Sequence, residues 1–327
     1  MKPMFIYSFA AINASQGWQG EQRSALVEDR KIRVLEPDYK VYIPDAGLRR
    51  RMSRVVKMGV AAAVECLRET DKEHIDAILT STGLGCLGDT EKFMNSILDH
   101  DERLLNPTAF IQSTFNTIGA QIALLCKNHH YNMTYVHRGF SWESALLDAR
   151  LCFAEGEAEL VLAGAVDELT ETAFRIQERM GCWKDYAAGE GAHFFVLGNQ
   201  AAGDAPAILD VETCREMESE EEVQYWVKRF LARSGYGFGD IDLILSGGRE
   251  IAGLFPENRS VDYKRYCGEY PTSAAFAVWL GCRLLKGEEC GNIPAGDIRR
   301  ILIYNNFRNV NHSVILMGKT GICGSEE

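Results

Sequence analysis

The sequence lacks the features that would place it in a membrane or on a nucleic acid. No apolar run approaches the roughly 18 residues that cross a membrane, and no basic segment followed by an apolar run opens the chain. Acidic residues outnumber basic ones, 46 to 35, which gives a net charge of -11. Because nucleic acids and anionic membranes attract basic surfaces, we expect neither as a partner.

The sequence also lacks paired cysteines. None of its ten cysteines forms a C-x-x-C pair, and most lie in apolar patterns such as Leu151-Cys152-Phe153. Zinc sites and dithiol redox centres use closely spaced pairs. We therefore expect reduced thiols, a cytoplasmic location and no bound metal.

What is present is the composition of an ordinary globular chain, 46% hydrophobic and 25% charged over 327 residues. Short buried strands alternate with helices, which predicts an α/β fold with both faces of the sheet covered. One order of elements occurs twice: a helix, a strand that ends in glycines, a small-residue helix and a final strand. The first copy has these at 54–68, 75–79, 118–127 and 192–198, and the second at 221–234, 241–245, 272–286 and 311–318.

The second copy is shorter than the first. Ile75 and His193 are 118 positions apart, whereas Ile241 and His312 are 71 apart, so about 47 residues of loops are missing from the second copy. A polar segment with Gly203 and Pro206, over residues 199–206, predicts the joint. We expect an N-terminal half over residues 1–200 and a shortened C-terminal half over 201–327.

One segment has the layout of a catalytic strand, turn and helix. A strand over 132–136 is followed by the turn Arg138-Gly139-Phe140-Ser141 and a helix over 142–155. Such a turn points its residue at the positive end of the helix dipole, where a thiol has a lowered pKa. Acyl-transfer enzymes place a nucleophilic cysteine there. This chain has Gly139 instead.

Further motifs follow one another along the chain. They are Met-Ser-Arg at 52–54, Asn-Pro-Thr at 106–108, Phe-Asn-Thr-Ile-Gly-Ala-Gln at 115–121, Gly-Glu-Ala-Glu at 156–159, Gly-Glu-Gly-Ala at 189–192 and Asn-Asn-Phe at 305–307. In order and spacing they resemble the β-ketoacyl synthases of the thiolase-like superfamily, over most of the chain. The resemblance implies a thiolase-like fold, in which two duplicated βαβ-type halves form an αβαβα layered body.

The resemblance also implies which groups are missing. A working ketosynthase uses a cysteine nucleophile, two histidines that polarise the malonyl thioester, and a supporting lysine. The cysteine position falls on Gly139, and the histidine positions fall on Gly247 and Glu269, while Lys264 keeps the lysine. The loss of all three reactive groups implies that this subunit does not carry out the condensation alone.

Chains of this kind occur in the family as chain-length-factor-like partners of active ketosynthases. The resemblance implies pairing through the strand at 132–136, with an active ketosynthase or with a second copy, and a part in shaping an acyl tunnel. The substrate would be a thioester on acyl carrier protein, and no cofactor is implied. Side chains expected at the acyl pocket or the interface are Phe115, Tyr135, His137, Phe140, Ser141 and Phe307.

Two alternatives stay open. In the first, the chain is an active acyltransferase that uses Ser141 with His137, oriented by Glu143 or Asp148, or that uses Glu269. A serine at this place more often caps the helix. In the second, the chain is a thiolase-fold structural homodimer that binds no acyl chain, which a Phe140, Trp142 or Phe307 side chain filling the space at Gly139 would favour.

A dinucleotide site is the remaining candidate. Residues 83–88 read G-x-G-x-x-G between a strand and a helix, as in Rossmann folds. No acidic residue ends a second strand about 20 positions later, so we interpret this segment as a tight turn.

Overall fold

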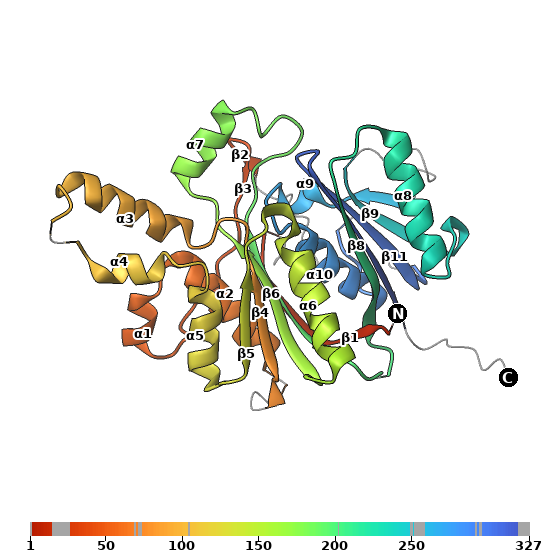
Figure 1. The fold of residues 1–327 in the computed structure, drawn as a ribbon, viewed down its shortest axis with the longest axis horizontal. Coiled ribbons are helices and arrows are strands. Elements are labelled where there is room, and N and C mark those ends of the chain that lie inside the picture. Colours follow the sequence, from red (N-terminus) through yellow and green to blue (C-terminus); the bar gives the residue numbers. More distant parts are fainter. Residues whose placement is uncertain are drawn as a thin grey trace.

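The computed structural model describes residues 2–14, 27–68, 70, 74–103, 105–201, 203–248, 251, 259–291, 293 and 296–319. All of residues 15–26, the start of the segment 15–53 that lacks clear periodicity, therefore lie outside the described part. A ten-stranded sheet forms the centre of the molecule, in the order β10-β9-β11-β12-β8-β1-β7-β6-β4-β5 (Figure 1). A two-stranded ribbon, β2 and β3, is separate from it.

The first half of the chain supplies β1 to β7. Its elements are β1 (Met4–Ile12), β2 (Val27–Glu28), β3 (Lys31–Ile32), α1 (Ala46–Arg51), α2 (Arg54–Cys66), β4 (Ala77–Ser81), α3 (Leu87–Asp99), α4 (Pro107–Gln112), α5 (Thr117–Cys126), β5 (Tyr131–Tyr135), the 3-10 turn η2 (Arg138–Phe140), α6 (Ser141–Glu155), β6 (Leu160–Asp167), α7 (Glu171–Arg179) and β7 (Gly191–Gly198).

The second half supplies β8 to β12. Its elements are β8 (Pro206–Arg215), α8 (Glu220–Arg233), the 3-10 turn η3 (Phe238–Asp240), β9 (Leu243–Gly247), β10 (Ser260–Asp262), α9 (Lys264–Cys267), α10 (Ala274–Leu285), β11 (Arg300–Phe307) and β12 (Asn311–Lys319).

The two halves repeat one strand pattern, which confirms the predicted duplication. Across the first half the order is β1, β7, β6, β4, β5, and across the second it is β8, β12, β11, β9, β10. In each, the first two neighbouring pairs are antiparallel and the next two are parallel. The halves meet where β1 pairs with β8 through two residue pairs, Met4 with Ile208 and Phe5 with Ala207.

The structure corrects one predicted equivalence. The sequence pairs the small-residue helix at 118–127, which is α5, with the one at 272–286, which is α10. In the structure α10 lies between β10 and β11, so its counterpart is α6, between β5 and β6. The second copy is short because residues 248–259 join β9 to β10, whereas residues 82–130 join β4 to β5.

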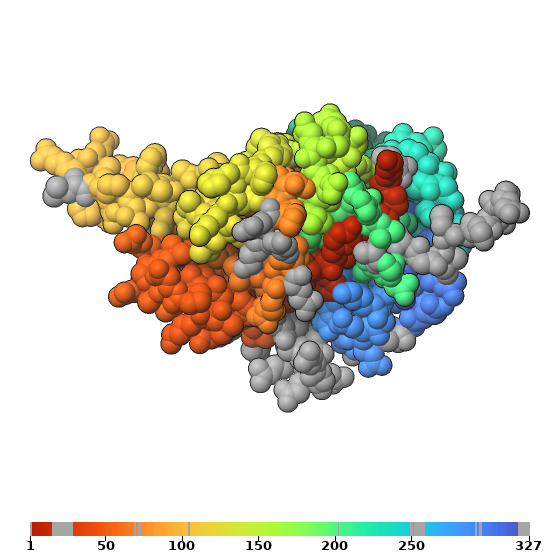
Figure 2. Space-filling view, turned by 90° about the horizontal axis from the view of Figure 1, so that it is seen from below, coloured from red at the N-terminus to blue at the C-terminus, as the bar shows by residue number. Residues whose placement is uncertain are grey.

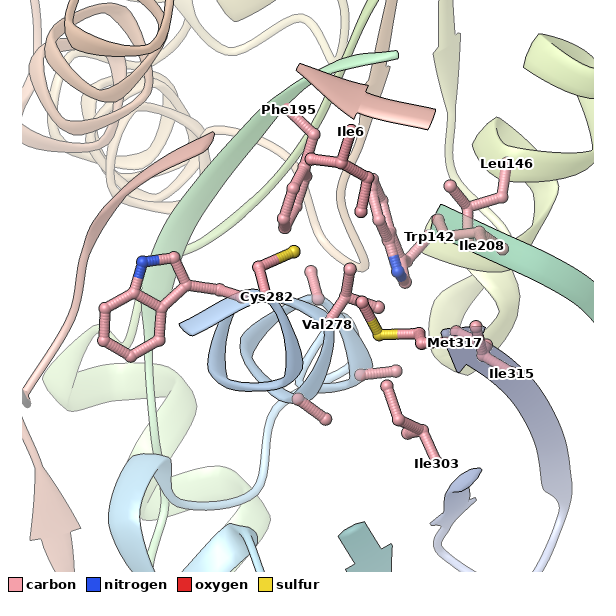
Figure 3. Packing of buried hydrophobic residues seen from close by; sticks show 14 of the residues in the cluster. Ile6, Trp142, Leu146, Phe195, Ile208, Val278, Cys282, Ile303, Ile315 and Met317 are labelled. Atoms are coloured by element: carbon pink, nitrogen blue, oxygen red, sulfur yellow. The ribbon is translucent and has the colours of Figure 1, made fainter. Parts of the chain in front are cut away.

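Three apolar clusters hold together the five layers that the resemblance to the thiolase-like superfamily implies. One cluster packs α2 and α5 on the first half of the sheet, and another packs α8 on the second half. The largest lies between them, where α6 and α10 are covered by sheet on both sides. Figure 3 shows its centre, where Trp142 and Phe195 face Val278 of α10 and Met317 of β12. The Trp142 and Phe195 ring centroids are 5.2 Å apart.

Helices α3 and α4 form an arm at one end of the body (Figure 2). Phe93 and Phe110 pack together within it, with ring centroids 5.2 Å apart. The nine cysteines of the described residues are free thiols. Among the described helices, none has the length and apolar character needed to cross a membrane.

Candidate functional site

The family positions predicted from the sequence gather at the carboxyl ends of the strands. Gly139 lies in η2 between β5 and α6, and Gly247 is the last residue of β9. Lys264 begins α9, and Glu269 follows that helix. A neighbouring position, Phe307, is the last residue of β11. Parallel strands β4, β5, β6, β9 and β11 all end on this side, which is where open α/β sheets bind ligands.

Gly139 is buried beneath the ring of Phe307. A Cβ atom added to Gly139 would lie 2.7 Å from Cδ1, 2.8 Å from Cβ and 2.9 Å from Cγ of Phe307. Phe307 itself is 7% exposed. The space that a nucleophilic side chain would take at this turn is therefore filled by the phenyl ring.

The space beside Gly247 is also occupied by neighbouring side chains. An added Cβ would lie 2.6 Å from the Tyr263 hydroxyl and 2.9 Å from Cε of Lys264. The Tyr263 hydroxyl donates to Oδ1 of Asn305 at 2.8 Å. Burial raises the pKa of Tyr263 well above its usual range, so the hydroxyl stays protonated. A side chain at residue 247 has no room beside this hydrogen bond.

Lys264 and Glu269 form a buried ion pair. Nζ of Lys264 donates to Oε2 of Glu269 at 2.8 Å and to the carbonyl of Asn306 at 2.6 Å. The Lys264 side chain is fully buried. Burial raises the pKa of the Glu269 carboxyl, and the charge of Lys264 opposes that rise. Glu269 thus presents a hydrogen-bond acceptor where a histidine would present a donor.

Two cavities border these residues. The first has a volume of about 260 Å³, and Glu269, Phe307, Arg308 and Trp183 are among its lining residues. The second has about 230 Å³ and includes Gly247, Glu269 and Arg308 in its lining. Glu269 and Arg308 border both cavities, so these two side chains divide one hollow from the other.

Two acidic residues at the end of β6 also line the first cavity. Asp167 is buried and accepts four hydrogen bonds, from the hydroxyl of Thr82, the backbone N–H of Gly83, and both the N–H and the hydroxyl of Thr272. Glu168 accepts from the N–H of Gly88 at 2.8 Å, and burial raises its pKa to about 7. Asp167 therefore ties the β4 turn to the start of α10, while Glu168 holds the start of α3.

The serine alternative does not assemble as predicted. The Ser141 hydroxyl is buried and donates toward the carbonyls of Thr82 and Arg138, both at 2.8 Å, and accepts the backbone N–H of His137. The His137 ring instead contacts the Ser144 hydroxyl, with 2.9 Å between Nδ1 and Oγ. Ser141 thus has a structural role, because its hydrogen bonds stabilise the turn.

The predicted orienting groups lie elsewhere. Glu143 is fully buried and accepts from the Ser313 hydroxyl at 2.5 Å, and burial raises its pKa to about 7. Asp148 interacts with Tyr131 and Tyr135 at the edge strand β5. Neither carboxyl contacts His137 through a hydrogen bond within the described residues.

The residues predicted for the acyl pocket or the interface do not all line one cavity. Phe307 lines the first cavity, but Phe115, Tyr135, His137, Phe140 and Ser141 are absent from the residues that line it. Phe115 is 52% exposed and its ring packs against Gly85, while His137 is exposed. Of the turn at 138–140, only Arg138 lines this cavity.

The glycine motif at 83–88 is a packing turn and has no room for a nucleotide. A Cβ at Gly83 would lie 2.2 Å from the ring of Pro271, and one at Gly85 would lie 2.3 Å from Phe115. The carboxylate of Glu168 occupies the start of α3, where a pyrophosphate would sit. In the described ranges, no three His, Cys, Asp or Glu side chains cluster as metal ligands do.

The sequence did not reveal two residues that shape this site. Tyr263 carried no motif signal, although it precedes Lys264 directly. Arg308 has a left-handed backbone, φ 58°, and lies over the rings of Trp183 and Phe307 at 5.5 and 5.0 Å. The sequence motif at this place ends at Asn-Asn-Phe, residues 305–307, and it gave no prediction for Arg308.

Comparisons with known proteins agree with this architecture. The sequence profile described as beta-ketoacyl synthase, N-terminal domain, matches residues 18–190, which is more than half of the chain. None of the curated proteins matches the sequence.

Several solved structures share the fold at low identity. The ishigamide ketosynthase/chain length factor superposes with a TM-score of 0.78 and 16% identity, covering 97% of this chain and 99% of that one. A ketosynthase (ApeO) in complex with its chain length factor (ApeC) from Xenorhabdus doucetiae gives 0.73 and 13%, covering 98% of each chain. A type II polyketide synthase acyl-carrier protein complex with its ketosynthase gives 0.75 and 13%, covering 97% and 99%.

Proposed function

The chain belongs to the β-ketoacyl synthase family, and we propose that it is a non-catalytic, chain-length-factor-like subunit of that family. In this role it pairs with an active β-ketoacyl synthase in the cytosol, in fatty-acid, polyketide or aryl polyene-type biosynthesis. The observation that carries the proposal is the phenyl ring of Phe307, which takes the space above Gly139.

The chemistry of the three altered positions supports this role. Condensation needs a nucleophile and donors aimed at a developing oxyanion. Gly139 and Gly247 offer no side-chain group, and each is covered by a neighbouring side chain. Glu269 offers an acceptor oxygen that would repel an enolate. The remaining cation, Lys264, is held by Glu269 and the Asn306 carbonyl.

The surface around β5 supports a subunit partner. β5 is at the end of the sheet order, so its outer side lacks a neighbour among the described strands. Edge strands of this kind pair readily with another chain. Apolar side chains surround it: Leu124, Leu125, Tyr131, Met133, Leu147 and Leu151 are all more than a third exposed. Two of the similar structures are ketosynthase and chain length factor assemblies.

A basic hollow near α1 supports docking of a carrier protein. Lys40, Arg49, Arg50 and Lys57 line a surface hollow of about 460 Å³ that has one acidic residue, Asp38. Within the described residues none of the four makes an ion pair with a carboxylate. In a chain of net charge -11, this hollow offers a place for an acidic carrier with its thioester-bound acyl chain.

The test is an elongation assay with malonyl-carrier protein and a candidate ketosynthase. It compares this chain alone, the ketosynthase alone and the co-expressed pair. We expect product from the pair only, and we expect Ser141→Ala and His137→Ala in this chain to leave the turnover of a folded pair in place. Turnover by this chain alone, abolished by either substitution, would overturn the proposal.

A matched pair of surface variants tests the interface. Met133→Asp places a charge on β5, whereas Met180→Asp places one on the 70% exposed Met180 after α7, away from β5. We expect Met133→Asp to lose the partner in co-purification and Met180→Asp to keep it. Equal retention by both variants would contradict pairing through β5.

A structural homodimer that holds no acyl chain is the second candidate, and the Phe307 ring at Gly139 favours it on one point. Analytical ultracentrifugation of the isolated chain, followed by titration with the ketosynthase, separates the two. A homodimer that the ketosynthase does not dissociate would favour the second candidate. A chain that exchanges into a mixed dimer would favour the first.

A further inference from the structure

The first cavity has an uneven distribution of charge. Its charged lining residues are Asp167, Glu168 and Glu269, which are buried or partly buried, and Arg138 and Arg308, which are exposed. The carboxyl groups are thus the more buried charges of the cavity lining, and the guanidinium groups are the more exposed ones. At about 260 Å³ the cavity is smaller than the roughly 300–1,000 Å³ that holds a drug-sized ligand.

Glu269 supplies an open acceptor where the first cavity borders the second. It is 5% exposed, and Oε2 accepts from Lys264, but Oε1 has no hydrogen-bond partner among the described residues. A buried carboxylate oxygen without a donor is unfavourable. A ligand ammonium or hydroxyl group in the cavity would supply the donor.

The other two acids differ in their capacity for a ligand. Asp167 already accepts four hydrogen bonds, two on each oxygen, so it is saturated. Glu168 accepts one N–H, from Gly88, on Oε1. Glu168 and Glu269 are therefore the two acids that could bind a cationic group.

The two arginines are placed to bind an anionic group. In the described residues neither Arg138 nor Arg308 makes an ion pair with a carboxylate. Arg308 donates to Oε1 of Gln177 at 3.2 Å and lies over the rings of Trp183 and Phe307. Arg138 follows β5 in a left-handed conformation, φ 56°. Both guanidinium groups belong to the lining of this cavity and would attract a ligand carboxylate.

Much of the remaining lining is apolar or aromatic. It includes Leu84, Leu169, Trp183, Tyr270, Pro271 and Phe307. They would bury an apolar or aromatic group of a ligand.

We propose that this cavity binds an α-amino acid with an apolar side chain, with its ammonium at Glu269 and Glu168 and its carboxylate at Arg138 and Arg308. The site needs no thioester, carrier protein or partner subunit, so it goes beyond the proposed function. Amino-acid binding can be measured on the isolated chain. The result therefore does not depend on the outcome of the elongation assay.

Isothermal titration with three probes tests the proposal. L-phenylalanine carries both charges, phenethylamine lacks the carboxylate, and 3-phenylpropionate lacks the ammonium. We expect L-phenylalanine to bind with a Kd below about 1 mM and at least about tenfold tighter than either other probe, since hydrogen bonds to charged groups have this effect.

Two variants test which residues bind the ammonium group and which bind the carboxylate of the ligand. Glu269→Gln keeps an acceptor for Lys264 and should abolish the advantage of L-phenylalanine over 3-phenylpropionate. Arg308→Gln should abolish its advantage over phenethylamine. The exposed residues Glu289 and Arg103 provide the matched controls Glu289→Gln and Arg103→Gln, which should change no affinity.

Two results would overturn the proposal. One is binding of L-phenylalanine weaker than about 1 mM to a folded wild-type chain. The other is equal binding of 3-phenylpropionate or phenethylamine. Near-UV circular dichroism of each variant checks folding, and Arg308→Gln, which changes an exposed residue, remains informative if Glu269→Gln fails to fold.

Discussion

Replacing Gly139 by alanine tests whether the Phe307 ring closes the nucleophile position. The new Cβ would lie 2.7 to 2.9 Å from three atoms of Phe307, well inside ordinary van der Waals contact. One of these atoms is the Cβ of Phe307, which a rotation of the ring leaves in place. Overpacking of this kind costs about 1–3 kcal/mol, and we expect Gly139→Ala to lower the free energy of unfolding by that amount.

A double-mutant cycle isolates the contact. Phe307→Ala alone should cost about 3 kcal/mol, at the low end for a buried phenylalanine because the ring borders the 260 Å³ cavity. In the Phe307→Ala background the clash is gone, so Gly139→Ala should then cost less than about 0.5 kcal/mol. The interaction energy should therefore be about 1–3 kcal/mol.

Urea unfolding followed by circular dichroism measures all four corners of the cycle. Gly239→Ala is the matched control, because an added Cβ there meets no atom within 4 Å. We expect that control to change the free energy of unfolding by less than about 1 kcal/mol. Additive effects of Gly139→Ala and Phe307→Ala, within about 0.5 kcal/mol, would refute the closure of this position by Phe307.

Three further predictions concern two buried carboxyl groups and the turn before α3. Burial raises the pKa of Glu143 from 4.5 to about 7, so this carboxyl binds its proton more tightly in the folded protein than in the unfolded one. The free energy of unfolding should therefore fall as pH rises from about 5 to about 8, by up to roughly 3 kcal/mol. Glu143→Gln should remove that part of the pH dependence, and pH-dependent urea midpoints that are parallel for wild type and variant would contradict it. Asp167→Asn should cost at least about 3 kcal/mol, because two of its four donors then face an amide N–H₂, while the exposed Asp204→Asn should change little. Gly85→Ala should cost more than about 1 kcal/mol through its φ of +70° and the ring of Phe115, measured by thermal unfolding, and an unchanged melting temperature would argue against the Phe115 contact.

Much of the fold could be predicted from the chain because its helices and strands have clear periodicity. The predicted helix at 54–68 is α2, Arg54–Cys66, and the predicted strand at 311–318 is β12, Asn311–Lys319. The pairing of α5 with α10 was wrong for a physical reason. Helix α10 has small apolar residues on all faces, which indicates a central layer. Helix α6 is also central, but its buried residues include the polar Ser141 and Glu143, so its sequence does not resemble that of α10.

The candidate site was less predictable, because the side chains that pack against Gly139 and Gly247 come from residues distant in the sequence. The family resemblance predicts that Gly139, Gly247 and Glu269 stand at the positions of the reactive groups. It could not show that Phe307, 168 positions after Gly139, covers that glycine, or that the Tyr263 hydroxyl takes the space beside Gly247. Those contacts arise when the two halves pack face to face around α6 and α10.

The central place of β1 has a consequence for synthesis on the ribosome. β1 pairs with β7 and β8, which begin at Gly191 and Pro206. At about 5–20 residues per second, β1 waits roughly 10–40 s for its first partner to emerge. During that time a nine-residue, mostly apolar strand, Met4–Ile12, has its backbone groups open to other chains. The nascent protein should therefore depend on holding chaperones until its first half is complete.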